Sequence, residues 1–221
     1  MDQQIIDFKQ KLAFENKQGL VLDLDETLSY TIGYWIEQLQ KKFGNPEHLS
    51  VKKMVDKYRY AQNVSYWQTS TALEWMENAR EDNKIQESLS LIDSANYFVN
   101  KINSIIPIVG YLTTRPRTVM PGTLKWLAKN NFPEVKVLAR PSEISSSEGD
   151  SWKAVVLNFL YPEVQGIIDD KSFIAESLPP DYKGIFFLYN SHTTKQKNIK
   201  VIPCKTWFDV YTQVKLTYGD K

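Results

Sequence analysis

Two pairs of aspartates each follow an apolar run. The stretch GLVLDLDETLSYT places Asp23 directly after apolar residues and Asp25 two positions later, and GIIDDK places Asp169 and Asp170 after another run. Residues two apart in an extended chain share a face, so Asp23 and Asp25 can project toward one site. Neighbouring carboxylates repel unless a proton or a cation lies between them, and carboxylate oxygens suit Mg²⁺. The pattern predicts a magnesium site, with polar turns and a helix cap as the alternative.

Hydroxyl and ammonium groups that could bind phosphate oxygens occur elsewhere in the chain. The run IIPIVGYLTTRP ends in Thr113 and Thr114, and Lys153 lies in the helical pattern SWKAVVLNFL. An ammonium group there could screen a nucleophilic carboxylate and bind the oxygens of a transferring phosphoryl group. The alternatives are a turn in which a Thr caps the next helix, and a lysine that is simply solvated.

The elements that must position these residues alternate along the chain. Apolar runs at 20–22, 105–112, 135–138, 164–168, 185–188 and 199–202 predict buried strands, and helical patterns cover 118–130, 151–160 and 207–216. Such alternation predicts an α/β fold with a Rossmann-like parallel sheet flanked by helices. Ligands of such sheets bind beyond the carboxyl ends of the strands, which is where the polar residues described above are expected.

A stretch of roughly 75 residues separates the first two strands, far more than an ordinary connection. Apolar residues recur at three and four positions within 32–43, 51–62, 69–80 and 85–102, which predicts about four helices. We therefore expect a core formed by residues 1–29 and 105–221, and an inserted, mostly helical cap over residues 30–104.

The four polar elements, in this order and at these strand and helix edges, resemble the motifs of the haloacid dehalogenase-like hydrolase superfamily. DLDETL resembles the first motif, Thr113 the second, Lys153 the third, and Asp169 with Asp170 the fourth. Because Thr114 is adjacent, the second-motif residue could also be one position later, but Thr113 directly follows the apolar run and is preferred. The insertion after the first motif resembles a helical cap. The resemblance spans residues 20–188.

The resemblance implies a phosphatase in which Asp23 is the nucleophile and Asp25 the general acid and base, an acid that dehalogenases lack. Asp23 would attack phosphorus to give an aspartyl-phosphate, and Asp25 would protonate the leaving group and then activate water. The resemblance also implies Mg²⁺ held by Asp23, the backbone carbonyl of Asp25 and Asp169, with Asp170 as a ligand or neighbour. Thr113 and Lys153 would complete the phosphate clamp.

Other activities remain open from the sequence. A phosphotransferase or mutase would use the same Asp23 and replace water by a second hydroxyl group. A non-catalytic protein that binds a phosphorylated ligand is the alternative from another class. DLDETL also resembles phosphatases that act on phosphoprotein tails, but those have little insertion after the first motif. The cap therefore favours a small phosphorylated metabolite as the substrate.

The expected cap is rich in aromatic residues. Tyr34 and Trp35 follow the first motif closely and could stack on a flat group, which makes a nucleotide the first guess for the substrate. The alternative is that these aromatic side chains form the apolar core of the cap itself.

Composition excludes several other classes. With 27 Lys and Arg against 26 Asp and Glu, the net charge of +1 provides no field for nucleic acid or anionic lipid. No apolar run is long enough to cross a membrane. One cysteine, Cys204, and two histidines make a disulfide or a zinc site of the Cys/His type implausible, so a cytoplasmic protein is expected. Nothing in the sequence sets the oligomeric state.

Overall fold

The computed structural model describes residues 1–194 and 198–219, and its main feature is one parallel sheet of six strands. The strand order is β5-β4-β1-β6-β7-β8, and every neighbouring pair is parallel. The strands are β1 (Gly19–Leu22), β4 (Ile108–Pro116), β5 (Lys136–Arg140), β6 (Val164–Asp169), β7 (Ile185–Tyr189) and β8 (Lys200–Cys204). The predicted α/β class is confirmed, and each of the six apolar runs overlaps a strand.

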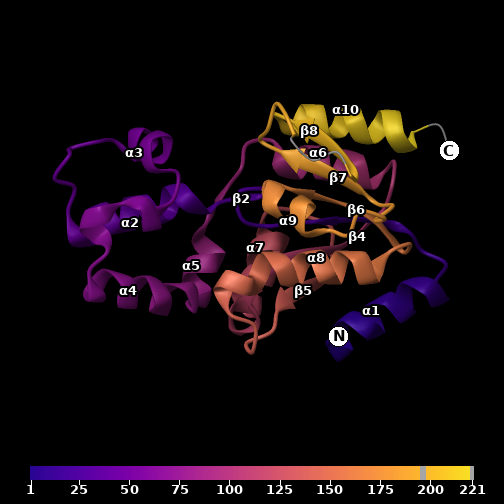
Figure 1. Cartoon of the computed structure of the whole chain (residues 1–221), viewed down its shortest axis with the longest axis horizontal. Helices are drawn as coiled ribbons and strands as arrows, with labels where there is room; N and C mark the ends of the chain where they lie inside the picture. The colour runs from indigo at the N-terminus through magenta and orange to yellow at the C-terminus, as the bar shows by residue number, and fades with distance from the viewer. Residues whose placement is uncertain (195–197, 220–221) are drawn as a thin grey trace.

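Both faces of the sheet are covered, which explains why its strands are continuous apolar runs. On β1, Leu20 and Leu22 belong to one apolar cluster, whereas Val21 belongs to the cluster on the opposite face. The first cluster includes residues of α6 (Ala95–Asn103), α7 (Met120–Lys129) and α10 (Trp207–Tyr218). The second includes residues of α1 (Gln3–Phe14), α8 (Gly149–Leu160) and α9 (Ser172–Ser177). Figure 1 shows α6 and α10 on one side of the sheet and α1 and α8 on the other.

The long connection after β1 contains mostly helices. It forms β2 (Ser29–Tyr30), α2 (Thr31–Phe43), α3 (Val51–Tyr58), two short 3-10 turns, α4 (Ser70–Arg80), α5 (Asn83–Ser88) and β3 (Ser90–Leu91). β2 and β3 pair antiparallel, so the chain leaves and re-enters the core at one point. Residues of α2, α3 and α4 share an apolar cluster of their own, which includes the fully buried Trp67. These three helices extend to one side of the core, away from both chain ends (Figure 1).

The last part of the expected cap differs from its prediction. Residues 85–102 read as one helical pattern, but the structure divides them among α5, β3 and α6. The apolar side chains Ala95, Val99 and Ile102 recur on one face of α6. They are buried in the first of the two apolar clusters that cover the sheet. α6 also lies against α10. The helical layer of the core therefore begins before residue 105, because the apolar face of α6 is buried on the sheet.

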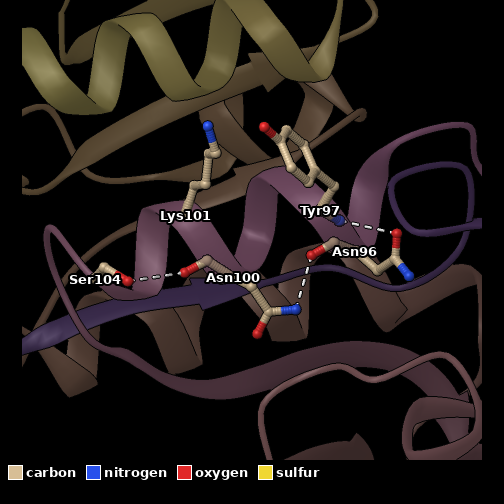
Figure 2. Close-up of a pocket in the computed structure, with 5 residues that line it drawn as sticks. All are labelled: Asn96, Tyr97, Asn100, Lys101 and Ser104. Carbon is tan, nitrogen blue, oxygen red and sulfur yellow. Dashed lines mark hydrogen bonds between the residues drawn. The ribbon is translucent and has the colours of Figure 1, made fainter.

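A hollow of about 460 Å³ follows the exposed side of α6 and is lined by Asn96, Tyr97, Asn100, Lys101 and Ser104 (Figure 2). Its lining contains none of the predicted site residues. Asn100 Nδ2 donates to the backbone oxygen of Asn96 at 2.9 Å, so these amide groups are already used in local hydrogen bonds. Within the described residues, none of the helices has the length and apolar character needed to cross a bilayer.

Candidate active site

The sheet brings the two predicted carboxylate pairs to one edge. β1 and β6 are neighbours, with Leu22 opposite Ile168. Asp23 follows Leu22 and Asp169 follows Ile168, so these two residues lie side by side. The backbone N–H of Asp23 donates to the oxygen of Ile168 at 3.0 Å. Asp23 and Asp169 are 3% and 0% exposed, respectively. The carboxyl ends of the two central strands thus place two buried carboxylates together.

Lys153 bridges these two carboxylates. Its Nζ donates to Asp23 Oδ1 at 2.5 Å and to Asp169 Oδ2 at 2.8 Å, and the side chain is 1% exposed. Burial alone would lower the pKa of Lys153, but Asp169 and Asp23 outweigh it and raise that pKa. Burial raises the pKa of Asp23 to about 7, with Lys153 opposing and Asp169 adding to the rise. The ammonium group is thus charged and screens the expected nucleophile.

Local structure explains how Lys153 reaches the sheet edge. Ser145 and Glu148 form a capping box before α8, in the serine-rich segment that precedes it. Lys153 is the fifth residue of α8, so it lies in the part of the helix closest to the strand ends. A Cβ atom on Gly149, the first residue of α8, would lie 3.0 Å from Thr114 Cγ2. Thr114 therefore contacts the start of this helix.

A third carboxylate completes a cluster that fits a cation. Ligand oxygens of Asp23, Asp169 and Asp170 all lie within 4.8 Å of one another. Asp170 Oδ1 is buried and has no hydrogen-bond partner among the described residues. Burial, together with the charges of Asp169 and Asp23, raises the pKa of Asp170. The three carboxylates outnumber the two ammonium groups that act on Asp170, those of Lys153 and Lys171, and Lys171 is itself paired with Asp150 at 2.9 Å. The cluster therefore has uncompensated negative charge and one orphaned oxygen, so the residues present fit a divalent cation with oxygen ligands.

We expect Mg²⁺ to raise the melting temperature of the protein, because it binds the folded cluster and not the unfolded chain. Asp170→Asn removes one charge and keeps the shape, so it should weaken this thermal shift. Differential scanning fluorimetry across a Mg²⁺ titration measures both, without using activity. An equal shift in wild type and Asp170→Asn would contradict the assignment of Asp170.

Asp25 is held by a different set of groups. Arg115 Nη2 donates to Asp25 Oδ1 at 2.6 Å, and Arg115 Nε lies 3.0 and 3.1 Å from its two carboxylate oxygens. The hydroxyls of Thr31 and Ser29 donate to Asp25 Oδ1 at 2.8 and 3.1 Å. Burial alone would raise the pKa of Asp25, but Arg115 and the hydroxyl donors lower it to about 2. The Asp25 side chain keeps 29% of its surface exposed, so a substrate can reach it.

The two threonines after β4 occupy different surroundings. Thr113 is fully buried, and its Oγ1 accepts a hydrogen bond from the backbone N–H of Arg115 at 3.2 Å. Thr114, besides contacting Gly149, accepts a bond from Arg140 Nε at its backbone oxygen, at 3.0 Å. Thr113 thus accepts a bond from the residue that holds Asp25, and its assignment as the second-motif residue, in preference to Thr114, stays a prediction. Its phosphate contact stays a prediction.

Two residues that sequence reasoning missed connect the site to its surroundings. Arg115 directly follows the threonines, and a cation at the end of a strand beside an acidic strand end was the available signal. Glu26 follows Asp25 and has a φ of 61°. Its Oε1 accepts from the backbone N–H groups of Thr31 and Ile32, both at 2.6 Å, and so caps α2. The first-motif loop is thereby fixed to the first helix of the insertion.

The aromatic residues singled out in the insertion contact other aromatic rings. Trp35 packs edge to face on Trp75 at 6.0 Å between ring centroids, and on Tyr34 at 5.7 Å. Tyr34 also packs against the first apolar cluster of the sheet, the one that includes residues of α6, α7 and α10. Both side chains are partly exposed. Part of their surface is therefore used in packing, and the rest faces solvent.

The pKa shifts predict how stability depends on pH. The pKa of Asp23 is about 7 in the folded protein and 3.8 ordinarily, so folding favours its protonated form. Below about pH 4 this preference contributes up to about 4 kcal/mol to the unfolding free energy, and the contribution is lost as the pH rises through about 7. Glu26, which burial raises to a pKa of about 7, acts in the same direction.

We therefore expect the unfolding free energy of the metal-free protein to fall between about pH 4 and about pH 7. Asp23→Asn should make this fall less steep, while Glu26 and Asp170, whose pKa values are also raised, still contribute to it. Asp25 does not interfere because its change lies below about pH 4. Urea unfolding in chelator at several pH values measures the slope. An equal slope in wild type and Asp23→Asn would contradict the shift.

Comparisons with known proteins identify the fold. No family model and no curated protein sequence matches the chain. Among solved structures, a HAD family hydrolase from Deinococcus radiodurans R1, with bound phosphate and sodium, is similar over 90% of this chain and 96% of its own, with 11% identity and a TM-score of 0.51. A structure described as a dehalogenase is similar over 90% of this chain and 97% of its own, with 12% identity and a TM-score of 0.54. Another, a dehalogenase with an intermediate complex, covers 89% and 96%, with 11% identity and a TM-score of 0.55.

These three structures share the architecture of the chain over nearly its whole length. The chain therefore has the fold of the haloacid dehalogenase-like superfamily, as its motifs predict.

Proposed function

We propose that the chain is a Mg²⁺-dependent phosphatase that hydrolyses a small phosphorylated metabolite through an aspartyl-phosphate on Asp23. One observation carries the proposal. Asp23 is buried at the end of the central strand, is screened by Lys153 and lies in a three-carboxylate cluster suited to a cation. Asp25, two residues later, is accessible and can move a proton.

The first half-reaction uses both aspartates of the first motif. A carboxylate oxygen of Asp23 forms a bond to phosphorus as the bond between phosphorus and the ester oxygen breaks. Asp25 is the proposed general acid: in the substrate complex it must carry a proton, so the phosphate dianion has to raise its pKa from the value of about 2 that Arg115 and the hydroxyl donors set. It then donates this proton to the departing oxygen and becomes a carboxylate. The products are an alcohol and the aspartyl-phosphate.

The second half-reaction returns the enzyme to its starting state. The Asp25 carboxylate takes a proton from water as the water oxygen bonds to phosphorus. The bond between phosphorus and the Asp23 oxygen breaks, which releases inorganic phosphate and restores the Asp23 carboxylate. The groups that can bind the phosphoryl oxygens throughout are the ammonium of Lys153 and, on the resemblance, the hydroxyl of Thr113.

Mg²⁺ held by Asp23, Asp169 and Asp170, with the backbone carbonyl of Asp25 as the resemblance implies, would supply charge neutralisation to the transferring group. The orphaned Asp170 oxygen supports this choice of ligands. The presence of Asp25 favours a phosphatase over a dehalogenase, since the resemblance implies that dehalogenases lack the second acid. We also propose a cytoplasmic location, which the free, buried Cys204 supports.

Substrate choice is proposed to lie with the insertion, because the core groups bind only the phosphoryl group. Trp35 is the candidate for stacking on a nucleotide base, since its ring is partly exposed beside Trp75. We expect Trp35→Ala to raise KM for nucleotide monophosphates relative to small alkyl phosphates by about tenfold, which corresponds to a base-stacking energy of roughly 1 to 3 kcal/mol. A KM panel measures the ratio. An unchanged ratio with a lowered melting temperature would assign Trp35 to packing.

Phosphate release from an aryl phosphate in Mg²⁺ tests the proposed function. The wild-type protein should release phosphate, and excess chelator should stop the release until Mg²⁺ is restored. Repeating the assay with added alcohols and analysing the products separates hydrolysis from phosphotransfer. Failure to release phosphate from an aryl phosphate and from a panel of phosphorylated metabolites, by folded protein in Mg²⁺, would overturn the proposal.

A further inference from the structure

Arg115 is a buried arginine at the end of β4 whose guanidinium group faces Asp25. Its side chain is 3% exposed, so its charge is compensated by the protein and not by solvent. Nε and Nη2 both donate to Asp25, which makes a forked contact from one planar group to one carboxylate.

The remaining nitrogen fixes the orientation of the fork. Arg115 Nη1 donates to the hydroxyl of Thr123 on α7 at 3.1 Å, and Thr123 is fully buried. Nη2 also donates to Ser29 Oγ at 2.8 Å, at the start of the insertion. Arg115 is thus held from α7 and from β2 while it holds Asp25, so its position is set by the core and the insertion together.

The two oxygens of Asp25 are not equivalent. Oδ1 accepts from Arg115 Nη2, Arg115 Nε, Thr31 Oγ1 and Ser29 Oγ. Oδ2, within the part of the chain that the structure describes, accepts only the longer bond from Arg115 Nε at 3.1 Å. The carboxylate is therefore anchored through Oδ1, and Oδ2 is the oxygen left to exchange a proton with a substrate or water.

We propose that Arg115 is a positioning residue that anchors Asp25 through Oδ1 and directs Oδ2 toward the reacting proton. This inference rests on the proposed phosphatase function, in which Asp25 moves a proton in both half-reactions. Arg115 does not touch the transferring group in this role; it acts through Asp25. A misplaced proton-transfer group can cost on the order of 10²-fold in rate.

The role predicts an unequal effect on the two half-reactions when the substrate is an aryl phosphate. An aryl oxide is a good leaving group and departs without a proton from Asp25, so formation of the aspartyl-phosphate depends little on Arg115. Its hydrolysis requires Asp25 to take a proton from water, so this step depends on Arg115. A general loss of structure would instead slow both steps.

The experiment measures the two rates by acid quench after rapid mixing of the full chain with an aryl phosphate in Mg²⁺. The variants are Arg115→Met, which removes the fork, and Arg115→Lys, which keeps the charge without the fork. Arg117→Met is the matched control, because Arg117 lies two residues away and pairs with Asp2 at 2.7 Å, outside the site.

We expect Arg115→Met to slow phosphoenzyme decay by about tenfold or more and to change its formation by less than about threefold. Arg115→Lys should recover part of the decay rate, and Arg117→Met should match wild type in both steps. Equal slowing of both steps, or unchanged decay, in folded Arg115→Met would overturn the proposal. Absence of phosphate release by the wild-type protein would instead contradict the proposed function.

Thr123 provides a milder test if Arg115→Met does not fold, because the loss of a buried ionic partner is costly. Thr123→Val removes only the hydroxyl that anchors Arg115 Nη1, and Thr123→Ser retains it. Phosphoenzyme decay should slow in Thr123→Val and recover in Thr123→Ser. Equal decay rates in these two variants would overturn the proposal.

Discussion

Asp23→Asn should lower turnover of a phosphate ester by on the order of 10⁴-fold or more, the loss seen when a nucleophile is removed from a catalytic unit. The amide has the shape of the carboxylate but cannot act as an anionic nucleophile. Steady-state phosphate release measures the loss. Turnover near the wild-type rate in purified Asp23→Asn would falsify the assignment of the nucleophile.

The melting temperature provides the control for this variant. Lys153 loses its bond to the Asp23 carboxylate but keeps Asp169 as its partner at 2.8 Å, so no buried cation is left unpaired. The substitution also removes one of three mutually repelling carboxylates. Thermal unfolding in chelator should therefore show a melting temperature no lower than that of wild type. A large loss of stability would mean that lost activity reports unfolding.

Lys153→Met should lower both the turnover rate and the free energy of unfolding. Asp23 and Asp169 would be left buried without their shared cation, and breaking a buried ion pair in this way costs about 3 to 5 kcal/mol. Turnover should fall by about 10²-fold or more, because the variant lacks a preorganised charge for the phosphoryl oxygens. Urea unfolding and phosphate release measure the two effects, and Mg²⁺ should restore part of the lost stability.

Lys41→Met is the matched control for that variant. Lys41 pairs with Glu37 at 2.6 Å on the surface of α2, where it is 61% exposed, and such exposed pairs contribute about 0 to 1 kcal/mol. Its stability and turnover should remain close to those of wild type. If Lys153→Met proved no less stable than Lys41→Met, the shared ammonium would not be holding the two carboxylates.

The strands and the main acidic cluster were predictable because their signals are local. A strand buried on both faces reads as a short apolar run, and in a parallel sheet the residues after such runs gather at one edge. Asp23 follows β1 and Asp169 is the last residue of the neighbouring strand β6, so the order of runs and acids along the chain was enough to expect them together.

The contacts of Asp25 were not predictable in this way. Arg115 lies 90 positions from Asp25, and its fork reaches that carboxylate only because β4 lies next to β1 in the sheet. The position of α6 was missed for a similar reason: its apolar face fits either a separate helical unit or the sheet, and only the tertiary packing decides. Glu26 was missed because its role requires α2 to begin within reach of its carboxylate.

Trapping the covalent intermediate tests the central claim most directly. Asp25→Asn should still form the aspartyl-phosphate from an aryl phosphate but should hydrolyse it slowly, so the intermediate accumulates. Acid quenching followed by intact-mass measurement and peptide mapping locates the phosphoryl group. The account predicts one phosphoryl group per chain, on Asp23, and none in the double variant with Asp23→Asn. A phosphoryl group on another residue, or turnover with no covalent intermediate in either background, would contradict the account.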